Sequence, residues 1–185
     1  MAIGGTAEGV DGLTRAGRSR CEPPPHRRPE LLYLLFDSSG SMNELRQAQA
    51  LSCAQQYARA VLATGAPVVV VNFALDSTFS PPTHDMLDVQ IALRAASDNR
   101  ATVLPTRGLQ SFFDPSIAAD LVIVSDGIFR TTPDVLIWYS YFLELNPDNR
   151  GTMYTVGSPG HREAVGRLRD IGFDVYMYEQ LHRGP

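Results

Sequence analysis

A carboxylate and two hydroxyls are closely spaced in one short stretch of the sequence. Residues 36–42 read Phe-Asp-Ser-Ser-Gly-Ser-Met and follow the apolar run 31–35, which places Asp37, Ser39 and Ser41 on the turn where a buried strand is predicted to end. All three side chains offer hard oxygen ligands, which suit Mg²⁺, Mn²⁺ or Ca²⁺ better than zinc. The same serines would also fit a turn in which they only cap a helix.

A second carboxylate follows another apolar run. Leu121–Val124 leads into Ser125-Asp126-Gly127. Ligands of parallel α/β sheets gather at the carboxyl ends of the strands. We therefore expect Asp37 and Asp126 to lie on the same edge of a sheet and to form a site for a divalent ion.

The elements that would position these side chains alternate along the chain. Short, continuously apolar runs predict buried strands, and helical spacing of apolar residues predicts the segments between them. Such alternation is typical of an α/β, Rossmann-like three-layer fold with a mostly parallel central sheet and helices on both faces. The predicted strands are 31–36, 68–73, 121–124, 152–156 and an edge strand at 173–178, and the predicted helices are 43–64, 86–97, 133–145 and 162–171, with a further short helix at 106–113 and a loop or short edge strand at 76–83.

The two acidic turns resemble motifs of the von Willebrand factor A family. Asp37, Ser39 and Ser41 match the Asp-x-Ser-x-Ser motif of its metal-ion-dependent adhesion site, and Asp126 matches its strand-end aspartate. The family also has a threonine ligand in a loop between them, and Thr102 is the preferred match, with Thr106 as the rival. Arg100 and Ala101 stand where the family usually has glycines. The resemblance covers about residues 30–180.

The resemblance implies recognition of a protein partner, not catalysis. In the family, the ion at this site (here Mg²⁺, with Mn²⁺ or Ca²⁺ as alternatives) keeps a coordination position for a Glu or Asp of the partner. Intracellular members commonly work with AAA+ ATPases, which makes such an ATPase a candidate partner. The residues expected to form the rim of the contact are Met42, Asn43, Asp76, Phe129 and Arg130.

Two other functions compete with this interpretation. A Mg²⁺-dependent phosphohydrolase of the haloacid dehalogenase type also has an aspartate after its first strand, but it needs a second acid two residues later, where this chain has Ser39, and a lysine, which this chain lacks. We therefore expect no enzymatic activity and no catalytic residues. An extracellular adhesion domain is the other alternative, and the lack of a recognisable signal peptide at the N-terminus disfavours it.

Composition and charge narrow the remaining classes. Residues 1–29 are rich in Gly, Arg and Pro and are predicted to be a flexible tail, leaving residues 30–185 as the domain. The net charge of the chain is −4, with the excess of acid in the domain, which argues against nucleic acid as a partner. No apolar run is long enough to span a bilayer. With only Cys21 and Cys53 present, a cytoplasmic protein with reduced cysteines is the simpler expectation.

Overall fold

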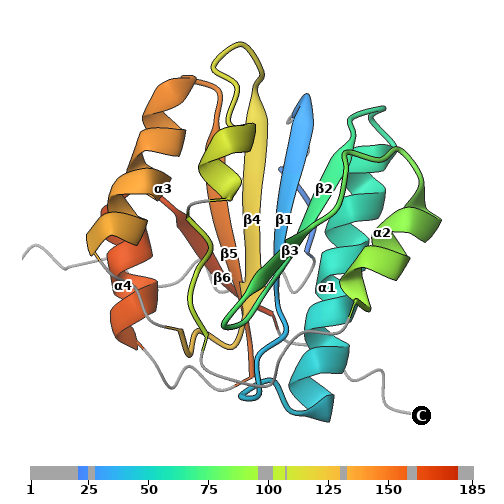
Figure 1. The fold of residues 1–185 in the computed structure, drawn as a ribbon, viewed down its shortest axis with the longest axis vertical. Helices are drawn as coiled ribbons and strands as arrows, with labels where there is room; N and C mark the ends of the chain where they lie inside the picture. The colour runs from blue at the N-terminus through green and yellow to red at the C-terminus, as the bar shows by residue number, and fades with distance from the viewer. Residues whose placement is uncertain are drawn as a thin grey trace, which may run out of the picture.

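In the part of the chain that the structure describes, six strands form one sheet that is parallel except at one edge (Figure 1). The computed structural model describes residues 21–24, 28–95, 102–106, 108–129, 133–157 and 162–178. The strand order is β3-β2-β1-β4-β5-β6; β3 pairs with β2 in antiparallel orientation, and the other four pairs of neighbouring strands are parallel. The strands are β1 (Leu31–Asp37), β2 (Val68–Phe73), β3 (Ser77–Phe79), β4 (Ala119–Ser125), β5 (Arg150–Val156) and β6 (Asp174–Tyr178).

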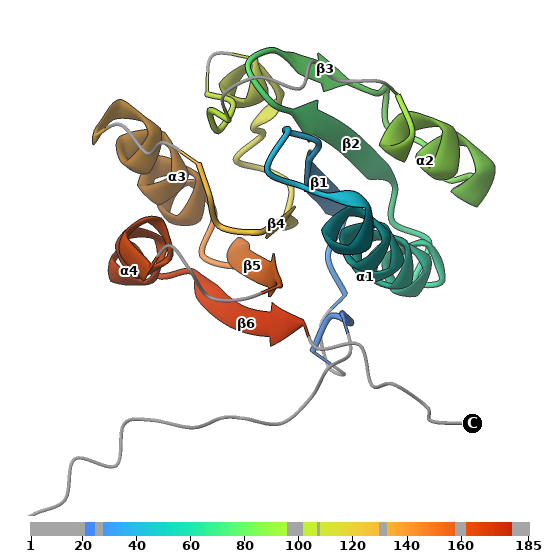
Figure 2. The same cartoon turned by 90° about the horizontal axis from the view of Figure 1, so that it is seen from below.

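The two faces of the sheet are covered by different helices (Figure 2). One face packs against α1 (Glu44–Leu62) and α2 (Met86–Leu93), and the other packs against α3 (Pro133–Leu145) and α4 (Arg162–Asp170). The short 3₁₀ helix η1 (Leu109–Phe112) contributes Leu109 to the second face. The predicted α/β fold with a three-layer arrangement is confirmed.

The central strands are apolar on both faces because both faces are covered. Along β1, Leu32, Leu34 and Phe36 face the α1 side, whereas Tyr33 and Leu35 face the α3 side. Every residue of β1, β2 and β4 is buried. This is why the sequence shows continuous apolar runs there and no alternation between polar and apolar residues.

The element boundaries differ from the predictions mainly at helix ends. Helix α2 ends at Leu93, and the expected helix at 106–113 is the four-residue turn η1. In α1 the apolar residues with helical spacing begin at Leu45, but Leu45 and Ala48 are exposed and the buried face begins at Ala50. None of the helices in the described ranges has the length and apolar character needed to cross a membrane.

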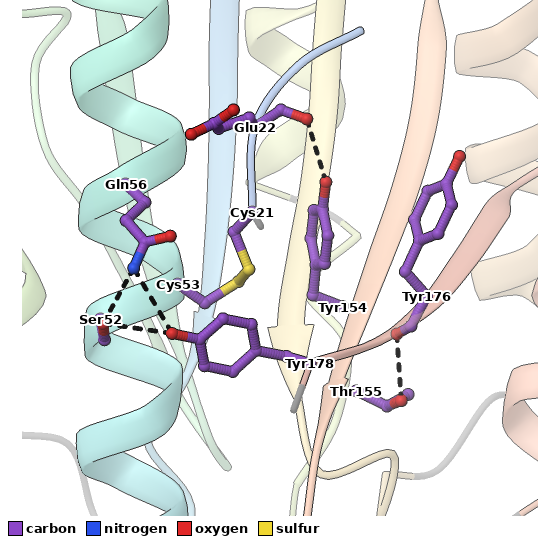
Figure 3. Close-up of a disulfide and its surroundings, with 9 residues drawn as sticks. All are labelled: Cys21, Glu22, Ser52, Cys53, Gln56, Tyr154, Thr155, Tyr176 and Tyr178. Carbon is purple, nitrogen blue, oxygen red and sulfur yellow. Dashed lines mark hydrogen bonds between the residues drawn. A yellow bond between two sulfur atoms is a disulfide. The ribbon is translucent and has the colours of Figure 1, made fainter. Parts of the chain in front are cut away.

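A disulfide joins Cys21 to Cys53 of α1 (Figure 3). Both cysteines are fully buried, and the Tyr154 hydroxyl on β5 donates a hydrogen bond to the Glu22 carbonyl at 3.3 Å. On the other side of the disulfide, the Tyr178 hydroxyl lies 3.3 Å from the Ser52 hydroxyl. The expectation of two reduced cysteines is therefore wrong for this structure. The segment at Cys21, predicted as part of a flexible tail, is fixed to the domain, while residues 1–20 of that tail lie outside the described residues.

Candidate metal site

Asp37 is the last residue of β1 and is fully buried. Its Oδ1 accepts a hydrogen bond from the Ser39 amide at 3.0 Å, and its Oδ2 accepts one from the Ser125 hydroxyl at 2.5 Å. Burial raises the pKa of Asp37, and the nearby Asp126 carboxylate raises it further, while the bonds from Ser125 and Ser39 oppose the shift. Both of these donors are neutral, so the buried carboxylate is electrostatically suited to a cation.

The loop after β1 brings the two serine hydroxyls together. The oxygens of Ser39 and Ser41 lie 3.1 Å apart. The loop closes through a bond from the Met42 amide to the Ser39 carbonyl at 3.0 Å, and Asn43 then caps α1 by accepting from the Arg46 amide at 3.0 Å. The cap of α1 is thus supplied by Asn43, which leaves the serine hydroxyls available as ligands.

Asp126 lies on the neighbouring loop, after β4. Strands β1 and β4 pair in parallel with Phe36 opposite Val124, so the next residues, Asp37 and Ser125, emerge side by side. The Asp126 Oδ1 accepts from the Ile128 amide at 2.9 Å, and its Oδ2 accepts from the Arg46 guanidinium at 3.0 Å. Gly127 has a φ of +80°, a conformation that suits glycine and turns the chain away from the strand.

The loop that carries Thr102 lies at the same carboxyl end of the strands as Asp37 and Asp126. The amide of Val103 donates to the carbonyl of Ala74, the residue after β2, at 2.9 Å, and Thr102 itself is buried. Thr106 leads into η1, where the Tyr33 hydroxyl bonds the Phe112 carbonyl at 2.5 Å. Because Tyr33 precedes Asp37 by four residues, η1 lies on the order of 13 Å back along the strand. The placement favours Thr102 over Thr106, and its role as a ligand stays a prediction.

The predicted rim residues divide into two groups. Asn43 and Asp76 are exposed, as a contact surface requires. The placement of Met42 and Phe129 on the rim is wrong, because Met42 is buried in the core on the α1 side and the Phe129 ring is buried against Phe73, with ring centroids 6.5 Å apart. Arg130 lies outside the described residues.

Two groups in the site were not singled out from the sequence. Ser125 follows from the strand register, because it must lie beside Asp37 once β1 and β4 are paired. Arg46 carries no such signal, since a basic residue in an exposed first turn is common. Two apolar side chains at this edge are also exposed, with Leu45 at 65% and Leu75 at 46% of their surface.

The donor set fits a hard divalent ion. It offers two buried carboxylates together with the hydroxyls of Ser39 and Ser41, with Thr102 on the adjoining loop. Oxygen ligands of this kind suit Mg²⁺, Mn²⁺ or Ca²⁺. Across the part of the chain that the structure describes, no three His, Cys, Asp or Glu side chains gather as a metal cluster. The candidate site is therefore of the hydroxyl–carboxylate kind.

Solved structures with a similar fold include those of a mussel byssus protein and a bacterial pilus adhesin. Proximal thread matrix protein 1 from the mussel byssus aligns with a TM-score of 0.62 and 11% identity over 87% of this chain and 44% of that chain. A structure of the same protein with a zinc-occupied MIDAS (metal-ion-dependent adhesion site) motif aligns with a TM-score of 0.60 and 12% identity over 85% of this chain and 44% of that chain. The pilus adhesin SpaC from Lactobacillus rhamnosus GG, in its open conformation, aligns with a TM-score of 0.62 and 10% identity over 86% of this chain and 29% of that chain. The fold is von Willebrand factor A-like.

These similarities concern the fold. The chain spans less than half the length of each of these structures. No family model and no curated protein matches the sequence. At 10–12% identity these structures show the fold alone.

Proposed function

We propose that this chain is a metal-dependent protein-interaction module, with a divalent ion held by Asp37, Ser39, Ser41, Thr102 and Asp126. The observation that carries the proposal is the buried Asp37 carboxylate, whose donors among the described residues are an amide and a hydroxyl and which lies beside the paired hydroxyls of Ser39 and Ser41. Burial without a cationic partner is costly for a carboxylate. A bound cation removes that cost.

The preferred ion is Mg²⁺, with Mn²⁺ or Ca²⁺ as alternatives. All five proposed ligands donate through oxygen, which favours these ions over softer ones. When bound, such an ion supplies a coordination position that a carboxylate oxygen can fill in place of water. The neighbour with zinc at its MIDAS motif supports a divalent ion at this place in the fold.

The partner is a protein that presents a Glu or Asp to the site. Around the site, the exposed Leu45 and Leu75 supply apolar contact area in the place of the buried Met42 and Phe129. Asn43 and Asp76 add exposed polar groups to the same rim. Apolar contact area bordered by exposed polar groups is the usual composition of a specific interface.

The proposed role is binding without catalysis. A strand-end phosphohydrolase needs an acid two residues after its aspartate, and in this site that residue is Ser39, whose hydroxyl is directed to Ser41. Phosphatase activity on a generic phosphomonoester should therefore be no higher in the native protein than in Asp37→Ala.

The disulfide indicates in which cellular compartment the protein binds its partner. A buried Cys21–Cys53 bond favours an oxidising compartment, since disulfides are rare in the reducing cytoplasm. It therefore favours the adhesion-type alternative over a cytoplasmic adaptor of an AAA+ ATPase. Thiol-blocking lysis of the native cells followed by mass spectrometry would distinguish the two. A Cys21–Cys53 linked peptide supports the adhesion-type alternative, and two blocked free cysteines support the cytoplasmic adaptor.

The experiment that tests the function is affinity capture of partners with and without EDTA. The baits are the native protein, Asp37→Ala and the control Asp174→Asn. Asp174 is a suitable control because it begins β6 and so lies at the amino end of the strands, opposite the site. We expect the partner to be captured by the native protein and Asp174→Asn, lost with EDTA, restored by Mg²⁺ and lost with Asp37→Ala. Capture that persists in EDTA and with Asp37→Ala contradicts the proposal.

The contact surface can be tested with the same captured partner. Leu45→Ala should weaken the complex without changing the affinity for Mg²⁺, because its side chain is exposed beside the site. Ile137→Ala is the matched control, since Ile137 is 63% exposed on α3, a helix outside the proposed rim. Equal effects of the two substitutions would place the contact surface elsewhere.

A further inference from the structure

Arg46 links the two halves of the candidate site. It lies in the first turn of α1, and its Nη1 donates to the Asp126 Oδ2 at 3.0 Å and to the Ser41 carbonyl at 3.1 Å. The side chain of Asp126 is only 1% exposed, whereas that of Arg46 is 29% exposed. One guanidinium group thus holds the loop after β1 against the loop after β4 and neutralises the buried carboxylate.

The chain leaves room for this side chain at the end of β5. A Cβ atom placed on Gly157 would lie 3.0 Å from the Arg46 Nε and 3.4 Å from its Cγ and Cδ. Gly157 also has a φ of +79°, which disfavours any side chain there. The aliphatic stem of Arg46 therefore passes over a glycine, and three segments of the chain (the two acidic loops and the residue after β5) together seat the guanidinium.

We propose that Arg46 is a built-in counter-cation that competes with the divalent ion at Asp126 and sets the affinity of the site. The inference rests on the proposed function, since it assumes that Asp126 is a ligand. Without the ion, the guanidinium satisfies Asp126 while Asp37 is left with neutral donors. With the ion bound, two positive groups face the same carboxylate, so the ion binds at the cost of the Arg46–Asp126 pair.

The competition also couples ion binding to the conformation of the loop after β1, which carries Ser39 and Ser41. The Arg46 guanidinium that leaves Asp126 is the same group that bonds the Ser41 carbonyl. Displacing it removes a tie between the loop that carries Ser41 and the loop that carries Asp126. The exposed Leu45 next to Arg46 lies on the proposed contact surface, so ion binding and the partner surface share one helical turn.

Calorimetric titration of the full chain with Mg²⁺ and with Mn²⁺ tests the inference. Arg46→Gln and Arg46→Met remove the charge, and the second keeps an aliphatic stem against Gly157. The matched control is Arg59→Gln, which makes the same change of charge in the last turn of the same helix, about 20 Å away. We expect affinity to rise on the order of tenfold with either Arg46 substitution and to change less than twofold with Arg59→Gln.

Thermal unfolding in EDTA gives a second readout. Removing the guanidinium leaves Asp126 buried without its charge partner, so Arg46→Gln should unfold at a lower temperature than Arg59→Gln, and added Mg²⁺ should raise its midpoint by more. If the native protein binds the ion and Arg46→Gln binds it no more tightly, the counter-cation role is overturned while the metal site stands. If neither the native protein nor any variant binds Mg²⁺ or Mn²⁺, the proposed function fails together with it.

Discussion

The Ser125 hydroxyl donates to the Asp37 Oδ2 at 2.5 Å, across the gap between two parallel strands. The Ser125 Oγ also accepts a hydrogen bond from the Gly127 amide at 3.0 Å. Ser125 therefore connects the carboxylate at the end of β1 to the turn that presents Asp126. A side chain of this kind orients a ligand without being one, and such partners commonly change metal affinity when they are removed.

Replacing Ser125 with alanine should therefore weaken the site. We expect the affinity for Mg²⁺ to fall by about 10- to 100-fold, because Asp37 loses a bond that fixes its orientation. Calorimetric titration measures the change. Ser140→Ala is the control, since that hydroxyl bonds Glu144 on α3, away from the site. An affinity that is unchanged in Ser125→Ala would show that the Ser39 amide alone is sufficient to orient Asp37.

Asp37→Asn should abolish ion binding and stabilise the metal-free domain. The substitution keeps the shape of the side chain and removes a buried charge whose pKa is raised chiefly by burial. Thermal unfolding in EDTA should show a higher midpoint for Asp37→Asn than for the native protein at neutral pH. A lower midpoint would mean that the carboxylate contributes to stability through its hydrogen bonds more than it costs through burial.

The gain in stability that we expect for Asp37→Asn in EDTA should depend on pH. Because the pKa of Asp37 is higher in the folded state than its ordinary value of 3.8, the folded native protein takes up this proton before the unfolded chain does. The native protein therefore recovers stability as the pH falls through the raised pKa toward 3.8, and the gap to Asp37→Asn should narrow over that window. A gap that is constant with pH contradicts the assignment.

The two candidate threonines should respond differently to loss of their hydroxyls. Thr102→Val should lower the affinity for Mg²⁺ on the order of tenfold, because Thr102 is buried beside the end of β2, next to β1. Thr106→Val should leave the affinity unchanged, because that residue leads into η1, farther back along the strands. Titration of both variants decides the matter, and the reverse order would place the ligand at Thr106.

Phe129 should matter for folding and not for partner binding. Its ring is buried against Phe73, so Phe129→Ala leaves a cavity and should lower the free energy of unfolding by about 3–5 kcal/mol. Urea denaturation measures this, with the exposed Ile137→Ala as a control whose effect should stay within about 0.5 kcal/mol. A small loss of stability in Phe129→Ala, accompanied by loss of the complex, would restore its predicted place on the rim.

Reducing the disulfide should destabilise the domain. Cys21 and Cys53 are 32 residues apart in sequence, and closing a loop of this size is worth about 3–4 kcal/mol through the entropy of the unfolded chain. Urea denaturation with and without a phosphine reductant measures the difference. The double substitution Cys21→Ala with Cys53→Ala should behave like the reduced protein and should not respond to the reductant.

The fold was predictable from the sequence because its signals are local and repeated. The apolar runs that became β1, β2 and β4 are unbroken since both faces of the sheet are covered, and no other element type explains them as well. The first turns of α1 were not predictable in this way. Leu45 fits the helical spacing, but the helix begins beyond the edge of the sheet, where nothing covers that side chain.

The site was predictable only in part because its remaining contacts are long-range. Asp37 and Asp126 each follow an apolar run, which marks them as strand-end residues. The bond from Arg46 to Asp126 joins residues 80 positions apart, and the disulfide depends on where the chain before β1 crosses α1. Neither leaves a periodic pattern, so only the three-dimensional arrangement reveals them.

The disulfide also determines how a mechanical load would travel through the domain. Residues 21–53 form a covalent ring that contains all of β1 and the Asp37–Ser41 loop. A pull on the chain ahead of Cys21 passes through the sulfur atoms directly to the middle of α1, which packs along the sheet. The force thus bypasses β1, so the strand that carries Asp37 stays in register while tension is borne elsewhere.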